Sequence, residues 1–314
     1  LFRDYGIHIN FAWQTFRWTS EASEKAAVHC VIVGFAAFDR PQKCIYKVGD
    51  EAQVAESISP YLVPGTSVLV AARSRPLCDV PKMNFGNQPR DGGNFVISPE
   101  ERADILSKSP ETARWLRPYI GAEEFINGKE RWCLWLKEAT PDVIRRDKIL
   151  YKKVNAVREF RLASTAKTTN GYARVPHLFA QITQPDGDDY LLIPRVSSER
   201  REYVPIGFMP ADTVASDAVQ IIPSATLYHL GVLSSSLHMA WMRAVCGRLE
   251  MRYRYSKDIV YNNFPWPGAS AAQRARIEEA AQGILETRAQ FPGASLADLY
   301  DAAAMPPALR EAHR

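Results

Sequence analysis

The stretch that decides the fold near the start of the chain is Val28-His29-Cys30-Val31-Ile32-Val33-Gly34-Phe35-Ala36-Ala37-Phe38. This almost unbroken apolar run is typical of a strand buried on both faces of a sheet. Before it, Ile7 to Trp18 is rich in aromatic and β-branched residues and predicts a strand, while Glu21 to Ala27 suits a short helix. A buried strand needs neighbours, and little sequence precedes this one. We therefore expect the chain to be a piece of a longer protein.

Further along the chain, short strand-like runs alternate irregularly with helices, which predicts the α+β class. The expected strands are Ser67–Ala71, Asn94–Ile97, Arg131–Leu136, Leu178–Ile182, Tyr190–Pro194, Tyr203–Phe208 and Val219–Ile222. The expected helices are Pro99–Ser107, Pro110–Tyr119, a long one at Thr140–Ala163, and Thr226–Cys246. After Gly268 the composition changes, and three more helices are expected to begin at Ser270, Ser295 and Pro306-Pro307.

Composition excludes several protein classes. The 314 residues are 46% hydrophobic and 24% charged, as in globular proteins. No apolar stretch approaches the roughly 20 residues that a membrane helix needs. The five cysteines are scattered without a Cys-x-x-Cys pair, which argues against a disulfide framework and a thiolate zinc site. No secretory signal is visible, so we expect a cytoplasmic location and no membrane partner.

The net charge of +4 comes from one stretch. Residues 140–164 hold seven Lys and Arg against three Asp and Glu, whereas the charges of the remainder balance. A basic stripe on a neutral domain favours binding to phosphates, although many such runs are simply solvated helix faces. The candidate phosphate contacts in this stretch are Arg145, Arg146, Lys152 and Lys153.

Common catalytic motifs are missing from the sequence. It contains no His-Glu-x-x-His, Gly-x-Ser-x-Gly, P-loop or Gly-x-Gly-x-x-Gly motif, and no Asp-x-Lys or Glu-x-Lys pair of metal-dependent nucleases. Also missing is the Asp/Asn-Pro-Pro-Tyr/Phe tetrapeptide with which amino-methylating enzymes hold an extruded base. His229 and His238 fall on opposite sides of their expected helix. We expect no catalytic, cofactor or metal site in this piece, and whether it is an enzyme stays open.

The most informative segment runs from Gly247 to Ser256. In an extended conformation Glu250, Arg252 and Arg254 share one face, on an apolar footing of Leu249, Met251, Tyr253 and Tyr255. An arginine can bind guanine O6 and N7 in the major groove, and a carboxylate can accept a hydrogen bond from cytosine N4. Glu250 and Arg252 can therefore read both bases of one C·G pair. The alternative is an ordinary edge strand whose Glu and Arg pair with each other.

Three further features each allow two interpretations. The loop Asn84–Asn94 is either a phosphate-binding loop or a tight turn. The segment Ser197–Tyr203, with Ser197, Ser198 and Arg201, is either a phosphate-contacting loop or a solvated one. The aromatic pairs Trp132/Trp135 and Phe264/Trp266 either stack on bases or anchor the core.

Several long motifs follow one another over nearly the whole chain. They are Phe16-Arg17-Trp18-x-x-Glu21-Ala22, Ala26 to Phe35, Phe85-Gly86-Asn87 with Asp91-Gly92-Gly93, Arg131 to Leu136, Ser197-Ser198-Glu199-x-Arg201, Tyr203 to Phe208, Gly247-Arg248-Leu249, Tyr253-Arg254-Tyr255-Ser256 and Tyr261 to Pro265. In this order they resemble the C-terminal half of the MmeI-like type II restriction-modification enzymes. Those enzymes join a nuclease, an adenine-N6 DNA methyltransferase and a target-recognition domain in one chain.

The resemblance implies a division into three parts: the last strands of a methyltransferase domain at residues 1–58, a DNA target-recognition domain at 59–264, and the start of a C-terminal helical region at 265–314. It also implies that the motifs for S-adenosylmethionine and for the target adenine lie upstream. The implied partners are double-stranded DNA and the rest of the parent methyltransferase chain. S-adenosylmethionine is then a cofactor of the parent, with none in this piece.

The resemblance also assigns roles to residues. It implies that Glu250 and Arg252 read one base pair, and that Arg254, with Asp217 and Ala218, reads a neighbouring pair. The implied phosphate contacts are Arg145, Arg146, Lys152, Lys153, Ser197, Ser198, Arg201 and Arg248. The expected function is sequence-specific DNA recognition within a methyltransferase. The rival hypotheses are a structural module that links the methyltransferase to partner subunits without base readout, and an autonomous methyltransferase with a disguised site.

Overall fold

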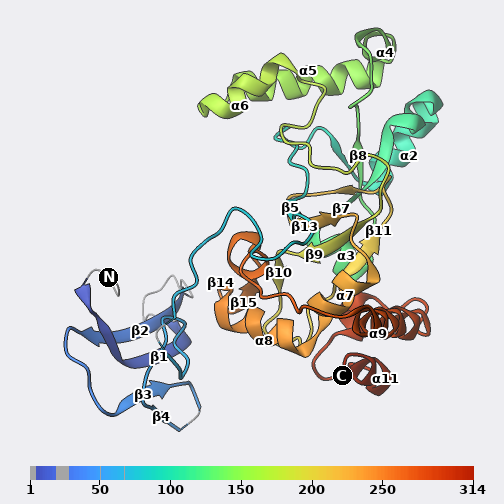
Figure 1. Cartoon of the computed structure of the whole chain (residues 1–314). Coiled ribbons are helices and arrows are strands. Elements are labelled where there is room, and N and C mark those ends of the chain that lie inside the picture. Colours follow the sequence, from blue (N-terminus) through green and yellow to red (C-terminus); the bar gives the residue numbers. More distant parts are fainter. Residues whose placement is uncertain (1–4, 19–27, 50, 67) are drawn as a thin grey trace. The chain divides into compact units, whose positions relative to one another are not determined.

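A computed structural model describes residues 5–18, 28–49, 51–66 and 68–314. The chain divides into two compact units. The first unit contains the described residues up to 78, with 197–199 and 240–265, and the second contains 79–196, 200–239 and 266–314. Both hold short strands and helices (Figure 1), which confirms the α+β class. None of the described helices combines the length and the apolar character that a membrane crossing requires.

The first unit contains a four-stranded sheet in the order β2-β1-β3-β4. The strand β1 pairs antiparallel with β2 and parallel with β3, and β4 is antiparallel to β3. The strands are β1 (His8–Trp18), β2 (Val28–Ala36), β3 (Lys43–Tyr46) and β4 (Gln53–Ala55). A small apolar core on this sheet consists of Ile9, Ala12, Ile45, Ala55 and Ile58.

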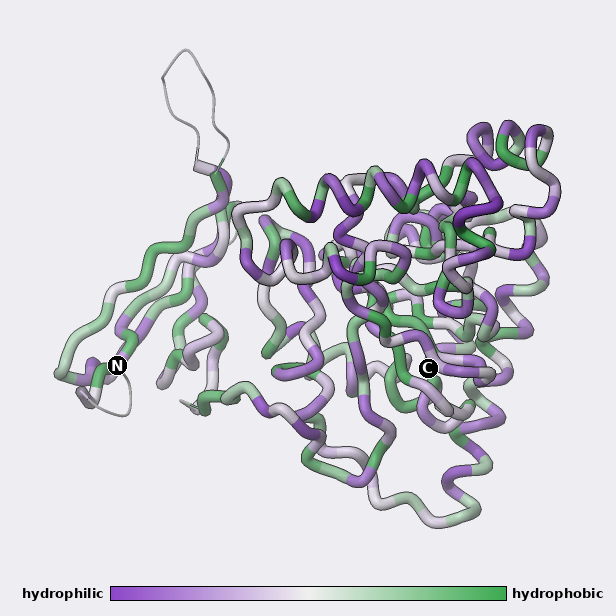
Figure 2. Tube along the Cα trace, turned by 90° about the horizontal axis from the view of Figure 1, so that it is seen from above, coloured by the Kyte–Doolittle hydropathy of each residue, from purple (hydrophilic) through white to green (hydrophobic). Residues whose placement is uncertain are grey.

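The apolar run from Val28 to Phe38 provides β2, but this strand is not buried. Among the described strands its one neighbour is β1. Val31 is 49% exposed and Phe35 is 59% exposed, and Figure 2 shows hydrophobic colour along the strands of this sheet. The expected burial on both faces is therefore wrong for the described structure, because no described layer covers this strand. The expected helix at Glu21–Ala27 lies outside the described residues.

The first unit also contains a β-hairpin. Its strands β14 (Gly247–Leu249) and β15 (Arg252–Arg254) are antiparallel, and β10 (Val196–Ser197) extends the small sheet beside β15. A π-helical turn, η3 (Lys257–Tyr261), follows the hairpin. The backbone N–H of Arg73 donates to Asp258, and that of Leu77 donates to Asn262. The strand expected at Ser67–Ala71 is wrong, because residues 68–71 carry no strand.

Two four-stranded sheets organise the second unit. One has the antiparallel order β11-β9-β13-β5, and the other has the order β12-β7-β8-β6 with β12 parallel to β7. The strands of the first are β5 (Asn84–Phe85), β9 (Tyr190–Pro194), β11 (Gly207–Met209) and β13 (Val219–Pro223). Those of the second are β6 (Val96–Ile97), β7 (Leu116–Ile120), β8 (Trp132–Leu134) and β12 (Val214–Ala215).

These strands confirm the expectations at Tyr190–Pro194 and Val219–Ile222 and are shorter than expected at Asn94–Ile97 and Arg131–Leu136. The strand expected at Tyr203–Phe208 begins only at Gly207 and continues to Met209. The segment Leu178–Ile182 contributes one isolated bridge, between Gln181 and Gln88, in place of a strand. The helix expected at Pro110–Tyr119 is wrong in its second half, because the 3-10 helix η1 (Pro110–Trp115) ends where β7 begins.

Helices cover both sheets of the second unit. They include α2 (Pro99–Lys108), α3 (Ala122–Asn127), α4 (Pro141–Arg146), α5 (Lys148–Leu162), α6 (Lys167–Gly171), the 3-10 turn η2 (Tyr172–Arg174) and α7 (Leu227–Ser234). The helix α8 (Ser236–Val245) leads toward the hairpin along the chain, and α9 (Ala271–Ala289), α10 (Leu296–Leu299) and α11 (Pro307–Ala312) follow it. The helix starts expected at Ser270 and Ser295 are confirmed, and each helix begins with a capping box.

Two helices expected to be continuous are each broken in two. The Asp147 carboxylate accepts hydrogen bonds from the backbone N–H groups of Ile149, at 2.8 Å, and Leu150, at 3.1 Å. Asp147 is thereby the N-cap of α5, so the helix expected over Thr140–Ala163 is divided there into α4 and α5. Ser235 is extended, with φ −68° and ψ 154°, and separates α7 from α8. The single helices expected at Thr140–Ala163 and Thr226–Cys246 are therefore wrong.

Apolar residues of the basic helix α5 pack into a core. Leu150, Val154 and Val157 of α5 are buried with Cys133 and Leu134 of β8 in the larger core of the second unit. Most basic side chains of α4 and α5 are exposed, namely Arg145, Arg146, Lys148, Lys152 and Arg158, whereas Arg161 is buried. The sequence pattern thus fixes which side of α5 can meet a ligand.

Candidate nucleic-acid interface

The hairpin presents a row of arginines on one face of β15. Arg252 and Arg254 are exposed, and Tyr253 between them is buried. In the register Leu249 lies opposite Arg252, and Gly247 lies opposite Arg254. Residues two apart in a strand share a face, so the predicted common face of Arg252 and Arg254 is confirmed. Directly paired residues also share a face, so Leu249, which is 43% exposed, lies on the side of Arg252, and the apolar footing expected of Leu249 is wrong.

Glu250 does not continue this row as a strand residue. It lies at the turn between β14 and β15, with a left-handed φ of 57°. Its carboxylate accepts a hydrogen bond from Nη2 of Arg252 at 3.0 Å. The expectation that Glu250, Arg252 and Arg254 lie on one extended strand is wrong for Glu250, but the chain reversal still brings its carboxylate to Arg252.

The Glu250–Arg252 pair is solvated. The Glu250 side chain is 60% exposed and that of Arg252 is 46% exposed. The pairing that the edge-strand alternative predicted is present. A module that only joins subunits requires these two side chains to be buried in ion pairs, and they are exposed. An exposed ion pair contributes at most about 1 kcal/mol. Base edges can therefore replace each partner at little cost.

The other predicted contacts of the first unit are Arg248, Ser197 and Ser198, and Arg248 lies on the opposite face of the hairpin. Arg248 is directly opposite Tyr253, and its guanidinium lies 4.1 Å over the Tyr253 ring. Ser197 is buried, and its hydroxyl has no hydrogen-bond partner among the described residues. Ser198 is half-buried. As phosphate contacts, all three stay predictions.

Asp217 and Ala218 belong to the second unit, where they form the turn between β12 and β13. Ala218 is exposed and Asp217 is half-buried. Oδ2 of Asp217 accepts a hydrogen bond from the Gln88 amide at 3.1 Å. Since Arg254 is in the first unit, the predicted grouping of Arg254 with these residues stays a prediction.

Arg195 is a residue that sequence reasoning missed. Its Nη1 donates to the backbone oxygen of Asp217 at 2.7 Å, and its backbone N–H donates to Ala218. Its guanidinium also lies over the Phe85 ring at 4.8 Å. The antiparallel pairing of β9 with β13 places this arginine beside Asp217. A lone arginine after an apolar strand carries no signal of this in the sequence.

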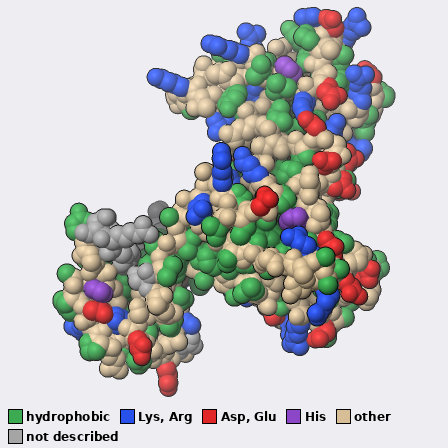
Figure 3. Space-filling view, viewed as in Figure 1, with side chains coloured by type: hydrophobic (Ala, Val, Ile, Leu, Met, Phe, Trp, Pro, Cys, Tyr) green, Lys and Arg blue, Asp and Glu red, His purple; other side chains and the backbone are tan. Residues whose placement is uncertain are grey.

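The basic helices α4 and α5 offer cations of two kinds. Arg146 and Lys152 are exposed, and Arg145 is exposed with Asp142 as its ion-pair partner. Nζ of Lys153 lies 2.5 Å from the Glu101 carboxylate, and the Lys153 side chain is only 19% exposed. Figure 3 shows Lys and Arg side chains along the outer surface around these helices. The exposed members are the better placed for phosphates.

Arg201 is less accessible than those cations. Burial lowers the pKa of its guanidinium, an effect that the Asp301 carboxylate opposes. Its Nε is buried without a hydrogen-bond partner among the described residues. A phosphate contact by Arg201 stays a prediction.

The polar side chains of the loop Asn84–Asn94 hydrogen-bond to backbone groups of the loop and of the neighbouring segment. The Asn87 side-chain oxygen accepts hydrogen bonds from the backbone N–H groups of Thr183, at 2.7 Å, and Gln184, at 2.9 Å. The Asp91 carboxylate accepts from the backbone of Gly93 and Phe95. Because these polar groups hold the loop's own backbone and its neighbours, the tight-turn interpretation is favoured over the phosphate loop.

The aromatic pairs anchor cores. Trp135 is buried against the Phe179 ring, with 5.1 Å between ring centroids, and Phe264 is 2% exposed. The Arg102 guanidinium covers the half-buried Trp132 ring at 3.9 Å. Base stacking is disfavoured for these side chains.

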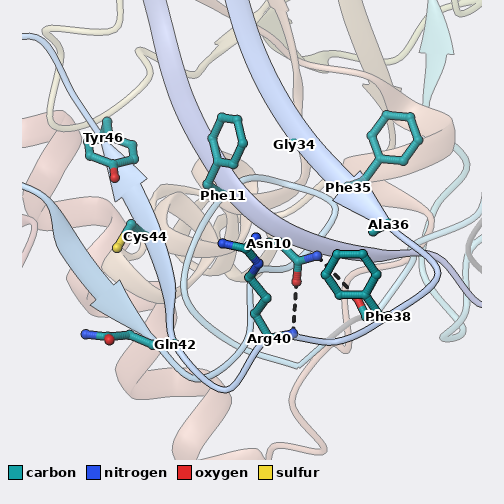
Figure 4. Close-up of a pocket in the computed structure, with 10 residues that line it drawn as sticks. All are labelled: Asn10, Phe11, Gly34, Phe35, Ala36, Phe38, Arg40, Gln42, Cys44 and Tyr46. Atoms are coloured by element: carbon teal, nitrogen blue, oxygen red, sulfur yellow. Dashed lines mark hydrogen bonds between the residues drawn. The ribbon is translucent and has the colours of Figure 1, made fainter.

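A cavity of about 430 Å³ lies on the sheet of the first unit. Figure 4 shows its aromatic lining, with the Asn10 amide bonded to the backbone of Phe38 and Arg40. Arg40 is the one charged residue in its lining. Its other titratable side chains are Cys44 and Tyr46, and its lining holds no carboxylate and no histidine. Among the described residues, no three His, Cys, Asp or Glu side chains are grouped to hold a metal ion.

Within the first unit, the exposed Arg/carboxylate hairpin is suited to base edges. The second unit, taken by itself, offers the Asp217–Ala218 turn held by Arg195 and the solvated cations of α4 and α5. Comparison with known families agrees. Residues 64–268 match the MmeI target recognition domain, 1–47 the MmeI DNA-methyltransferase domain and 269–314 the MmeI C-terminal domain. The chain therefore belongs to the MmeI family and carries its target recognition domain.

Individual relatives support this membership. The chain is 40% identical over 309 residues to DNA methyltransferase A of Bacillus subtilis (strain 168), covering 98% of this chain and 35% of the relative. It is 46% identical to the Type IIL restriction-modification enzyme MmeI, solved in complex with DNA, with a TM-score of 0.95 over 98% of this chain and 42% of that one. The chain thus spans less than half the length of each relative.

Proposed function

We propose that this chain is the sequence-specific double-stranded DNA recognition part of an adenine-N6 DNA methyltransferase of the restriction-modification type. The observation that carries the proposal is the exposed Glu250–Arg252 pair at the tip of the β14–β15 hairpin. Membership of the MmeI family supports it, and so does the DNA in the solved structure of MmeI. The rival structural module is disfavoured, because it requires that pair to be buried.

Recognition divides between two sets of groups. Arg252 binds guanine O6 and N7, while Glu250 accepts from cytosine N4 of the same base pair. Arg254 and the Asp217–Ala218 turn contact a neighbouring pair. The exposed cations of α4 and α5 approach backbone phosphates, which position the protein without reading sequence.

S-adenosylmethionine is proposed as the methyl donor of the whole protein, in the cytoplasm. The cavity in the first unit does not fit this cofactor, because its lining offers no carboxylate for a ribose hydroxyl. No step of recognition therefore runs through the cofactor. The proposed division into parts at residues 1–58, 59–264 and 265–314 assigns methyl transfer outside the recognition part.

Binding to a randomised duplex library tests the proposal. The protein is incubated with the library at low and at near-physiological salt, and the retained DNA is sequenced. Enrichment of one short motif with a fixed C·G pair, surviving the higher salt, is expected. Salt-sensitive retention without enrichment contradicts base readout, because counterion release alone gives such binding. No retention at either salt favours the structural module.

A further inference from the structure

The backbone of the loop Asn84–Asn94 is held by one buried arginine, Arg161. Arg161 of α5 is fully buried, and its guanidinium donates five hydrogen bonds, all to backbone oxygens. The acceptors are Pro89, Arg90, Tyr172, Val175 and Leu178. Two of the five lie within the loop, so α5 fixes the path of its backbone at Pro89 and Arg90.

This anchor holds Arg90 in an unusual conformation. Arg90 has a left-handed φ of 44°, which costs free energy for any residue other than glycine. The hydrogen bond from Arg161 Nε to the Arg90 oxygen, at 3.0 Å, stabilises that conformation. As a result the Arg90 side chain turns back along its own loop toward Gln88.

The side chains of the loop form a chain of hydrogen bonds that ends on Asp217. Nε of Arg90 donates to Oε1 of Gln88 at 2.8 Å, and Nε2 of Gln88 donates to Oδ2 of Asp217 at 3.1 Å. The backbone of Gln88 is itself held by two hydrogen bonds to Gln181. All of these residues belong to the second unit.

The two charges at either end fix the orientation of the Gln88 amide. Its oxygen faces a guanidinium donor and its NH2 group faces a carboxylate acceptor. A flip of the amide would set NH2 against N–H and oxygen against carboxylate, so one orientation is strongly preferred. The amide therefore holds Oδ2 of Asp217 in one position.

Fixing Oδ2 leaves the second carboxylate oxygen for a ligand. Among the described residues Oδ1 of Asp217 makes no hydrogen bond, and the neighbouring residue of the turn, Ala218, is small and exposed. A carboxylate oxygen in such a place accepts from an exocyclic amino group of a base. Its direction decides which amino group can reach it.

We propose that Gln88 is a positioning residue for DNA recognition: with Arg90, it sets the orientation of the Asp217 carboxylate and so determines base preference at one position. This inference rests on the proposed function of the chain as a recognition part. It assigns to the loop a role in specificity without any phosphate contact of its own.

The test compares base preferences of variants in the randomised duplex library. Gln88→Leu removes both amide groups, and Gln88→Glu keeps the Arg90 contact but repels Asp217. Both are expected to lower the preference at one base pair of the motif about tenfold, with the other positions and the melting temperature unchanged. Gln181→Leu is the matched control, because the Gln181 side chain is exposed on the segment bridged to Gln88.

A double-substitution cycle links the effect to Asp217. Asp217→Asn is expected to relax the same base pair, and adding Gln88→Leu to it should have little further effect. Unchanged preference in both Gln88 variants overturns the positioning role while leaving the proposed function intact. A uniform loss of affinity with a lower melting temperature also overturns it, since that marks a purely structural residue. If the unsubstituted protein enriches no motif, the proposed function itself fails, and the positioning role with it.

Discussion

Across the turn of the β14–β15 hairpin, the Arg252 guanidinium donates a hydrogen bond to the Glu250 carboxylate at 3.0 Å, with both side chains exposed. The two side chains carry opposite charges and contribute little to the stability of the fold. The contribution of the pair to stability is about 1 kcal/mol at most. The charges can therefore be exchanged without unfolding the hairpin.

The double substitution Glu250→Lys with Arg252→Asp is expected to swap the preferred C·G pair to G·C at one position and to leave the others alone. Lysine then donates to guanine, and aspartate accepts from the opposite cytosine. Library enrichment measures the outcome, and in a methylating parent the mapped methylation site does so too. An unchanged motif, or one degraded at every position, contradicts readout by this pair.

Lys152→Ala is expected to weaken binding to all duplexes alike and to reduce the slope of log affinity against log salt by about 1, because one phosphate contact is lost. Lys108→Ala on α2 is the control, since Lys108 is also an exposed lysine and is paired with Asp104. Titrations at several salt concentrations provide the slope. Equal slopes for the two variants would remove Lys152 from the interface.

Gly86→Ala is expected to destabilise the second unit by about 3 kcal/mol. A Cβ at this position would lie 2.0 Å from the backbone oxygen of Ser216, and the backbone there cannot yield without moving Asp217. Gly171→Ala in α6 meets nothing within 4 Å and is the matched control. Chemical denaturation measures both. Equal unfolding free energies would show that the β5 and Ser216 segments are not packed as described.

Arg161→Lys is expected to cost about 3 kcal/mol or more of unfolding free energy, because one ammonium cannot satisfy five buried oxygens. Arg158→Lys, on the exposed side of the same helix, should change little. Thermal and urea melts of the two variants decide the matter. A small effect at Arg161 would mean that the loop does not depend on this anchor.

The stability of the chain is expected to fall in acid through His313. Burial lowers the pKa of His313 to about 4, assisted by the charge of Arg288, and the contact with the Ser234 oxygen opposes the shift. The folded state therefore stays neutral where the unfolded chain takes up a proton. The free energy of unfolding is unaffected above pH 6.5 and falls by up to about 3 kcal/mol as the pH drops toward 4.

His313→Gln removes this titration while keeping an acceptor for the Tyr300 hydroxyl, which lies 2.8 Å from Nε2. In the variant, the free energy of unfolding should depend less steeply on pH between 6.5 and 4, by the slope that corresponds to the uptake of one proton on unfolding. The remaining slope includes fully buried His238, whose pKa burial lowers to about 3. Urea melts across this range measure the slope. Identical slopes for the variant and the unsubstituted protein would rule out His313 as the source.

Local signals in the sequence predicted the helix ends well where a side chain announces them. The helices expected to begin at Ser270 and Ser295 do so, with capping boxes formed by Ser270 with Gln273 and by Ser295 with Asp298. Asp147 gave no such warning, because its neighbours continue the helical pattern on both sides. Its role as a cap depends also on Thr112, which donates to the Asp147 carboxylate at 2.6 Å from 35 residues away.

The turn of the β14–β15 hairpin could not be predicted from the sequence for a similar reason. Alternation of polar and apolar residues runs unbroken through Glu250 and Met251, and the turn has neither the Gly nor the Asn that usually supplies a positive φ. The contact between Gln88 and Asp217 joins residues 129 apart in the chain. No periodicity reports such a distance, so Gln88, Arg90 and Arg195 emerge only from the folded chain.

In the β14–β15 hairpin, the groups that stabilise the fold are different from the side chains that are exposed at its tip. Its backbone pairing and the buried Tyr253 ring hold the shape, while the side chains at 250 and 252 point into solvent and carry little of the folding free energy. Substitutions there are nearly invisible to selection for folding. On the proposed base readout, a lineage can therefore accumulate neutral variants at these two positions and change its preferred DNA sequence while the hairpin keeps its fold.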